Sequence, residues 1–249
     1  MIEIKHFSLV LFSTFFLAAC GGGSSSSGDS VDVGDINIDI PTDPETGELR
    51  PKIYTYETGK IIYDVQIEST LGDFITVTEE GTKRFVFKDW GNLRIEEYEG
   101  ERTSVITDLM TGAVTTEVET IHELRKWDTP KSYDVNFDHE TITMLDFSPV
   151  LTGLTNDELV DAIAPDEVEP LTADGVKIIA LTSCTNYVIN EFFTQCINEG
   201  AIGRSGIELE SIFSTDSGSS TETATSVHFD VFVDDSEFDI PNYTILTGN

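Results

Sequence analysis

Basic residues are scarce in this chain. Its 249 residues include 14 Lys and Arg against 46 Asp and Glu, which gives a formal net charge of -32. Phosphate binding needs clustered Lys and Arg, so this balance excludes a nucleic-acid partner. It also argues against adhesion to an anionic lipid surface through protein charge. The acidic excess fits a solvated surface or contact with divalent cations.

Long hydrophobic runs are also missing. The apolar run at residues 7–19 is too short for a membrane-spanning helix, which needs about 20 residues. Lys5 precedes the run, and small residues end it at Cys20. A basic start, a short apolar segment and small residues before a break are typical of a signal peptide.

The last four residues of this run read LAAC and end on Cys20. They resemble the lipobox of bacterial lipoproteins, which implies cleavage before Cys20 and lipid attachment to its thiol and its new amino group. The residue that follows is Gly21, whereas lipoproteins retained in the inner membrane usually carry Asp there. The resemblance therefore implies an outer-membrane lipoprotein anchored in the membrane through Cys20. The alternative is an ordinary signal peptide with a chance cysteine.

The segment after Cys20 is rich in Gly, Ser and Asp and has no basic residue before Arg50. Such a segment repels itself and buries little, so we expect a disordered linker. Its acidic residues lack the Gly and Glu positions of a calcium-binding loop. The sequence thus predicts a signal peptide at residues 1–19, a lipidated cysteine and linker at 20–50, and a single β-rich domain at 51–249.

Apolar residues alternate with polar ones in several runs of the domain, such as IIYDVQIE at residues 61–68, KRFVFK at 83–88 and SVHFDVFVD at 226–234. A period of two predicts strands with one apolar face. Glycines separate many of these runs at a spacing of roughly ten residues, which is typical of turns in an antiparallel meander; they are Gly72, Gly81, Gly91, Gly100 and Gly112. We therefore expect a mainly β fold, a curved antiparallel sheet of about nine to eleven strands that forms a half-open barrel.

One segment departs from this rhythm. Thr155 can cap a helix with Glu158 at its third position, and Pro165 ends the apolar periodicity. The pattern predicts one short helix at residues 156–164, which we expect to cover the apolar face of the sheet.

Two blocks carry a further resemblance, GKIIYDV…GTKRFVFKDWG and LTSCTNYVINEFFTQCINEGAIGRSGIELES…ETATSVHFDVFVDDSEFDIPNYTI. They resemble an uncharacterised family of bacterial envelope domains, with a lone helix in mid-chain and a closing segment here at Asp235 to Pro241. That family is similar in architecture to the periplasmic lipoprotein carriers LolA and LolB. The resemblance implies a half-open β-barrel covered by helices.

Only three cysteines are present, and lipidation of Cys20 leaves Cys184 and Cys196. These two pair by default in an oxidising compartment. Their midpoint is Asn190, which suits a hairpin turn with the thiols on opposite arms. A redox role would need a CxxC spacing or basic neighbours, and neither is present. We expect a structural disulfide.

Catalytic and metal-binding motifs are missing as well. The histidines His122, His139 and His228 form no HExxH or closely spaced pair, so we expect no metal site. Ser205 lacks the GxSxG context of a hydrolase nucleophile, and no glycine-rich phosphate loop occurs. Nothing in the sequence indicates a cofactor or an enzyme.

Three functions remain open. The first is a non-catalytic envelope lipoprotein that shelters an apolar ligand, such as a lipid or an acyl chain, on the concave face of its sheet. Candidate ligand-binding residues are the strand aromatics Phe85, Phe87, Tyr133, Phe137 and Phe229, which can equally fill the core. The second is a structural or surface-interaction lipoprotein without a small-molecule ligand. The third is a hydrolase with dispersed catalytic residues.

Overall fold

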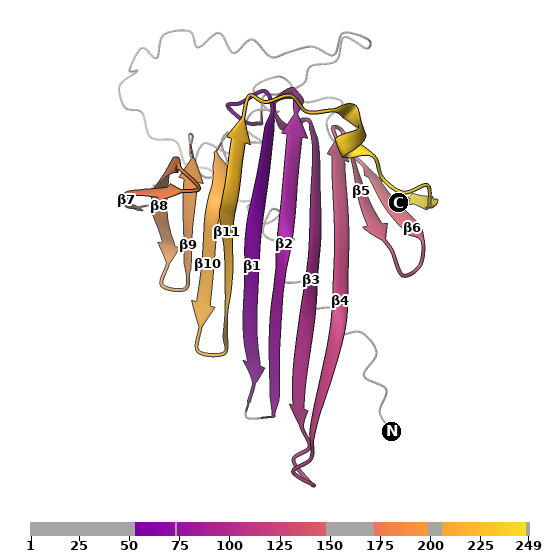
Figure 1. Cartoon of the computed structure of the whole chain (residues 1–249), viewed down its shortest axis with the longest axis vertical. Helices are drawn as coiled ribbons and strands as arrows, with labels where there is room; N and C mark the ends of the chain where they lie inside the picture. Colours follow the sequence, from indigo (N-terminus) through magenta and orange to yellow (C-terminus); the bar gives the residue numbers. More distant parts are fainter. Residues whose placement is uncertain (1–52, 73, 148–171, 199–205, 248–249) are drawn as a thin grey trace, which may run out of the picture. The chain divides into compact units, whose positions relative to one another are not determined.

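The computed structural model describes residues 53–72, 74–147, 172–198 and 206–247. In these ranges the chain forms one open, curved sheet of twelve strands and two short 3-10 helices (Figure 1). The mainly β prediction is confirmed. None of the helices in the described ranges is long and apolar enough to cross a membrane. The expected helix at 156–164, the signal peptide and the linker lie outside the described residues.

Successive strands make up most of the described chain. The elements are β1 (Gly59–Leu71), β2 (Ile75–Lys88), η1 (Asp89–Gly91), β3 (Leu93–Thr107), β4 (Val114–Asp128), β5 (Lys131–Asn136), β6 (Thr141–Asp146), β7 (Thr172–Ile179), β8 (Thr182–Asn190), β9 (Phe193–Asn198), β10 (Ile207–Thr215), β11 (Gly218–Phe229), η2 (Asp235–Phe238) and β12 (Thr244–Thr247).

The strands follow the order β12-β6-β5-β4-β3-β2-β1-β11-β10-β9-β8-β7. Strands β1 to β6 form a meander that runs away from β1 in one direction. Strands β7 to β11 form a second meander that returns to β1, where β11 pairs antiparallel with it. Only β12 runs parallel to its neighbour, β6. The first and the last long strands of the sequence are therefore side by side at the middle of the sheet.

The strands are longer than the glycine spacing predicts. Gly72 and Gly112 lie in turns with positive φ, as expected. Gly81 and Gly100 do not: they lie inside β2 and β3, where they pair directly with each other. A Cβ atom added at either position would come within 2.6 Å of the Tyr98 ring or hydroxyl, so these two glycines make room for that side chain. The prediction of turns at both positions was wrong.

The apolar run at residues 226–234 is likewise not one strand. β11 ends at Phe229, and Asp230 has a left-handed φ of 51°. Its N–H donates to the carbonyl of Thr58, at 2.9 Å, and the Thr58 hydroxyl donates to the carbonyl of Val231, at 2.7 Å. Here the chain leaves the sheet and crosses its upper end (Figure 1). Phe229 consequently packs in one core and Val231 in another.

The two cores belong to opposite faces of the sheet. On β1 and β2 the odd-numbered residues form one face, where Ile61 pairs with Phe85 and both are buried. The even-numbered residues of β2 point to the other face, where Val86 pairs with the buried Ile95 of β3. This second core is covered by the C-terminal segment at residues 231–243, whose Phe238 is 2% exposed.

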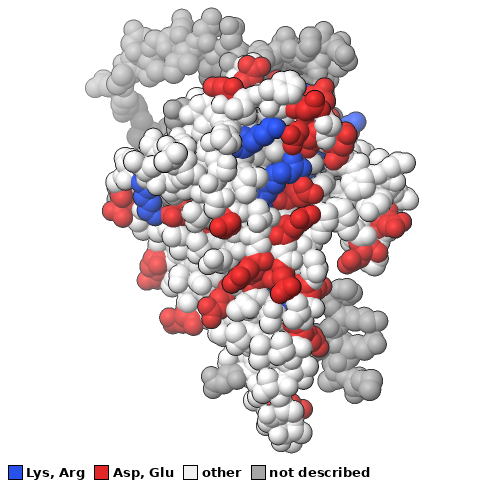
Figure 2. Space-filling model, viewed as in Figure 1, with Lys and Arg blue, Asp and Glu red and all other residues white. Residues whose placement is uncertain are grey.

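Ion pairs fasten the C-terminal segment to the sheet. Glu237 of η2 accepts hydrogen bonds from Lys60 at 2.6 Å and from Arg84 at 2.9 Å. Arg84 also donates two hydrogen bonds to Glu97 of β3, and Lys88 pairs with Asp235. Figure 2 shows Lys and Arg side chains gathered in the upper part of the visible face and surrounded by Asp and Glu. Lys60, Arg84 and Lys88 thus hold acidic residues of η2 and β3 in place.

The sheet curls toward the face that carries Ile61. Three strands separate β7 from β11, so in a flat sheet the two would lie about 19 Å apart. Instead they are in contact, and Ile179 of β7 belongs to the same buried cluster as Ile61 and Phe87. We call the face with the odd-numbered residues of β1 and β2 the concave face, and the opposite face the convex face.

Candidate functional site on the concave face

Aromatic side chains close one end of the concave face. The chain just before β1 lies over Phe85 and Phe87: the Tyr54 ring is 4.8 Å from Phe87, and Tyr56 stacks on Phe229 at 4.0 Å. Backbone hydrogen bonds from Ile53 and Tyr54 to the carbonyl of Trp90 hold this segment on η1. Phe87 is fully buried and Phe85 is 6% exposed. At this end the concave face is filled by the protein's own side chains.

The five aromatics predicted to line a ligand site do not share a face. Phe85, Phe87 and Phe229 lie on the concave face. Tyr133 and Phe137 of the segment around β5 pack instead in the convex-face core. The five predicted aromatics are therefore divided between the two faces of the sheet. Each strand presents only alternate residues to one face, and the odd residues of β5 lie on the convex face.

A charged cluster lies next to the aromatic end. Lys83 of β2 forms an ion pair with Glu222 of β11 across the intervening β1, and its Nζ lies 4.6 Å from the centre of the Tyr63 ring. The side chains of Lys83 and Glu222 are 22% and 17% exposed. The Tyr63 hydroxyl donates to the carbonyl of Glu208, at 2.7 Å, and Gln195 donates to the Glu208 carboxylate. We call Lys83, Glu96, Glu208 and Glu222 the Lys83 cluster.

The Lys83 cluster holds more negative than positive groups, and this shifts its pKa values. Burial and the neighbouring Glu222 and Glu96 together raise the pKa of Glu208 to about 7, against the opposing effects of Lys83 and Gln195. Burial lowers the pKa of Lys83, but Glu222 and Glu96 outweigh burial and leave it above its ordinary value. Lys83 therefore stays charged, while Glu208 can gain or lose a proton near neutral pH.

Beyond the cluster the concave face continues as a short, partly open apolar strip, which borders the buried Glu79 of β2 and its ion-pair partner Arg102 of β3. Val65 and Ile67 of β1 lie on the concave face and are half-buried, whereas Asp64, Gln66 and Glu68 on the convex face are exposed. The neighbouring Ser220 of β11 is buried. The concave face thus changes along its length from a closed aromatic end, through a charged cluster, to an accessible apolar strip.

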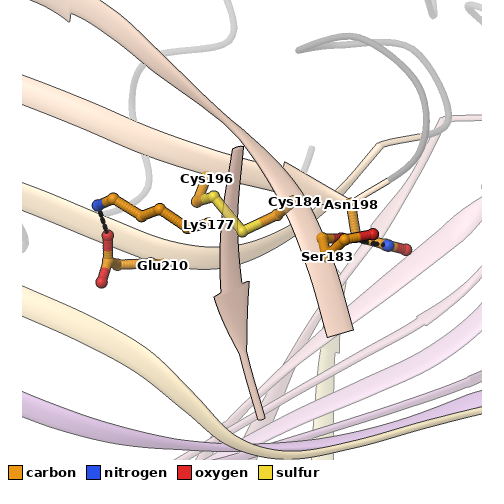
Figure 3. The surroundings of a disulfide bond; sticks show 6 residues. All are labelled: Lys177, Ser183, Cys184, Cys196, Asn198 and Glu210. Carbon is orange, nitrogen blue, oxygen red and sulfur yellow. Dashed lines mark hydrogen bonds and ion pairs between the residues drawn. A yellow bond between two sulfur atoms is a disulfide. The ribbon is translucent and has the colours of Figure 1, made fainter. Parts of the chain in front are cut away.

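Two cysteines link neighbouring strands of the second meander, β7 to β11. Cys184 of β8 and Cys196 of β9 lie at disulfide distance, with their Cα atoms 5.4 Å apart (Figure 3). The hairpin turn falls at residues 190–193, as predicted, but the two cysteines are not direct partners. Cys196 pairs with Asn186, two residues along β8 from Cys184, so the bridge runs diagonally.

Polar contacts flank the bridge in Figure 3. Lys177 of β7 pairs with Glu210 of β10, and Asn198 donates to the carbonyl of Ser183 at 2.7 Å. These contacts and the bridge link β7, β8, β9 and β10, which are the strands that curl over the concave face. The curl of this half of the sheet is therefore held by covalent and ionic links as well as by apolar packing.

The sequence prediction missed the charged cluster because its members come from four strands that are distant in the chain. One signal was present. Lys83 occupies the same alternation phase as Phe85 and Phe87, and Glu222 shares the phase of Ala224 on β11. A charged residue in the inward phase of an amphipathic strand indicates a buried ion pair or a site.

The histidines and the serine considered as catalytic or metal-binding residues lie in different parts of the sequence. His122 lies on β4, His139 in the β5–β6 turn and His228 on β11, where its Nε2 is 3.2 Å from the Ser226 hydroxyl at an exposed position. Ser205 lies outside the described residues. These histidines are therefore not brought into one catalytic group.

Open hollows of the described surface are polar. One of about 350 Å³ lies at the middle of β1 and β2 and is lined by Asp64, Val65, Gln66, Glu80, Gly81 and Thr82. A second, of about 260 Å³, lies at the β10–β11 turn and is lined mainly by Ser, Thr and acidic residues. Neither resembles the mostly apolar, enclosed pocket typical of drug-sized ligands.

No family model matches this sequence, and no characterised protein sequence matches it either. Among solved structures, an uncharacterized conserved protein from Thermus thermophilus superposes with a TM-score of 0.39 at 7% identity, over 75% of this chain and 90% of the other. A putative outer membrane lipoprotein-sorting protein domain from Vibrio parahaemolyticus superposes with a TM-score of 0.22 at 6% identity, over 75% and 91%. Both superpositions are too loose to support an argument about function.

Proposed function

We propose that this protein is a non-catalytic, lipid-anchored envelope protein that holds an amphiphilic ligand, a lipid or another acyl-chain compound, on the concave face. The apolar chain of the ligand lies along Val65 and Ile67, and its polar end meets the Lys83 cluster. The observation that carries this proposal is the position of half-buried carboxylates inside a curled sheet, directly beside an accessible apolar strip.

The charge of the cluster selects the polar end of the ligand. Three carboxylates surround one ammonium group, so an additional anion would be repelled and a positively charged or hydrogen-bond-donating group would be attracted. Glu208 supplies the adjustable charge, because its raised pKa lets it ionise when a cation arrives. An alkylamine-like headgroup therefore fits better than a phosphate or a free fatty-acid carboxylate.

The aromatic end has a supporting role in this proposal. Phe85 and Phe87 are buried and lie against the ring of Tyr54. They fix β1 and β2 in the curled arrangement, and a ligand contacts the strip beyond the cluster instead. The Phe229–Tyr56 stack closes the same end.

The anchor belongs to the proposal as well. Lipids on Cys20 hold the chain at the outer membrane, and the Gly, Ser and Asp linker at residues 20–50 spaces the domain from the headgroups. The domain can then take up or release an amphiphile close to the bilayer surface.

The test is a binding titration of the full-length chain with a fluorescent long-chain alkylamine and with the matching fatty acid. We expect the amine to bind more tightly than the acid. Val65→Lys puts an ammonium group on the strip opposite Glu222, where it competes with an amine ligand for the carboxylates, and should weaken amine binding by at least about tenfold. Gln66→Lys changes the adjacent, exposed residue on the convex face and is the matched control. Equal effects of the two substitutions would contradict a site on the concave face.

One observation favours a second candidate function. The hollows at β1–β2 and at the β10–β11 turn are polar and acidic, and such a surface attracts cations or a basic protein partner. If neither amphiphile binds the full-length chain, the structural or surface-interaction lipoprotein is the better account. Cross-linking in intact envelopes would then identify the partner.

A further inference from the structure

Three metal-ligating side chains converge on the convex face, away from the proposed ligand site. Glu99 of β3 pairs in register with His122 of β4, and Glu97 lies two residues before Glu99 on the same face. The His122 Nε2 atom is 3.2 Å from Oε1 of Glu97 and 3.7 Å from Oε1 of Glu99. One ligand atom from each residue lies within 4.8 Å of the other two.

These separations match a metal site. Zinc binds imidazole nitrogen and carboxylate oxygen at about 2.0–2.2 Å in tetrahedral geometry, so neighbouring ligand atoms lie roughly 3.3–3.5 Å apart. The two measured distances bracket that value. We infer that Glu97, Glu99 and His122 form a site for one zinc ion, whose fourth position is open to solvent. This inference does not depend on the proposed ligand.

Two of the three ligands are held in position by other side chains. The ring of Phe137 stacks on the His122 ring with centroids 3.8 Å apart. Arg84 donates to Oε2 of Glu97 through Nε and an amino group, at 3.1 and 2.9 Å, which leaves Oε1 toward His122. Such outer contacts orient metal ligands and reduce the cost of ordering them. Glu99 is 71% exposed and can move to complete the coordination.

The ligand set also indicates which metal binds. One imidazole nitrogen with two carboxylates suits zinc, whereas calcium and magnesium take oxygen ligands almost exclusively and in larger number. The two carboxylates neutralise the charge of the ion. The strong negative charge of the chain raises the local concentration of any divalent cation. Selectivity for zinc over calcium must therefore come from His122.

The test is a calorimetric titration of chelator-treated full-length protein with zinc chloride, in the presence of excess calcium and magnesium. We expect one zinc ion per chain at this site and at least a tenfold loss of affinity in His122→Ala. His139→Ala removes a histidine outside the cluster, and Glu101→Gln removes the next acidic residue on the same strand and face. Both controls should bind zinc as the wild type does.

A second variant and a second measurement show whether the loss of zinc binding in His122→Ala results only from misfolding of that variant. Glu99→Gln changes an exposed side chain and should also weaken zinc binding. Cobalt in the wild-type site should show the visible absorption of a tetrahedral ion, and Glu99→Gln should reduce it. Absence of zinc binding by the wild type, or equal binding by His122→Ala and His139→Ala, would overturn the assignment and leave only an ion pair between His122 and its two glutamates.

Discussion

Lys83 of β2 and Glu222 of β11 form an ion pair across β1, above the ring of Tyr63. This pair joins the two meanders at the middle of the sheet, where the first and last long strands meet. It also places positive charge close to Glu96 and Glu208 on the same face. The charge balance of the concave face therefore depends on this contact.

The pKa of Glu208 predicts a pH-dependent stability. In the unfolded chain this carboxyl ionises near 4.5, and in the folded protein near 7. Between these values the unfolded state loses the proton first, so the contribution of Glu208 to stability falls as pH rises from about 4.5 to 7 and is constant above that. Glu208→Gln removes this loss and should raise the free energy of unfolding at pH 8 by about 1–3 kcal/mol relative to wild type.

Urea denaturation of both proteins at pH 5 and pH 8 measures this effect. The advantage of Glu208→Gln should be small at pH 5 and larger at pH 8. Glu210→Gln, two residues along β10, loses an ion pair with Lys177 and serves as the control. If the difference in the free energy of unfolding between Glu208→Gln and wild type does not change with pH, Glu208 is not buried beside Glu222 and Glu96 as described.

The bridge between β8 and β9 predicts a second result. The thiols of Cys184 and Cys196 should resist alkylation in protein from the envelope until a reductant is added. Cys184→Ser should lower the free energy of unfolding by about 3 kcal/mol, because closing so short a loop constrains the unfolded chain by that amount. Alkylation with a mass tag measures the protection of the thiols, and chemical denaturation measures the free energy of unfolding of Cys184→Ser. Freely reactive thiols in native protein would refute the pairing.

The C-terminal segment offers a matched pair of phenylalanines. Phe238 is 2% exposed in the convex-face core, whereas Phe232 of the same segment is 83% exposed. Phe238→Ala should reduce the free energy of unfolding by about 3–5 kcal/mol through lost burial and the cavity left behind. Phe232→Ala should change it by less than about 0.5 kcal/mol. Similar losses for the two variants in thermal or urea unfolding would mean that the segment does not pack as described.

The lipid anchor is tested separately. Cys20→Ser removes the thiol that accepts the lipid and should abolish incorporation of labelled palmitate in bacterial cells. The chain should then accumulate as a precursor or be released. Gly21→Ala keeps the acceptor cysteine and should still be labelled. Undiminished labelling of Cys20→Ser would exclude a lipoprotein.

Strand faces could be predicted from the sequence wherever alternation alone decides them. The odd residues of β1 point inward from Ile61 to Ile67, as the pattern indicates. Alternation could not show that Phe229 and Val231 pack on opposite faces, because that follows from a single left-handed residue, Asp230. It also could not show that Gly81 and Gly100 meet under one tyrosine. Both features depend on the pairing of distant segments.

The candidate site was less accessible to sequence reasoning. The aromatics predicted to bind a ligand pack in the two cores of the sheet. The charged side chains of the concave-face cluster come instead from β2, β3, β10 and β11. In a chain with 46 acidic residues, no single Glu stands out. Only the register of β1 with β2 and β11 shows that Lys83 and Glu222 share a face.

Photo-cross-linking can show whether an amphiphile occupies the concave face. A long-chain alkylamine with a diazirine in its chain is added to the full-length protein, the sample is irradiated, and the labelled residues are mapped by mass spectrometry. We expect labels on the odd residues of β1, chiefly Val65 and Ile67, and competition by unlabelled alkylamine. Labels confined to Asp64, Gln66 and Glu68, or labelling that excess alkylamine does not reduce, would contradict a site on the concave face.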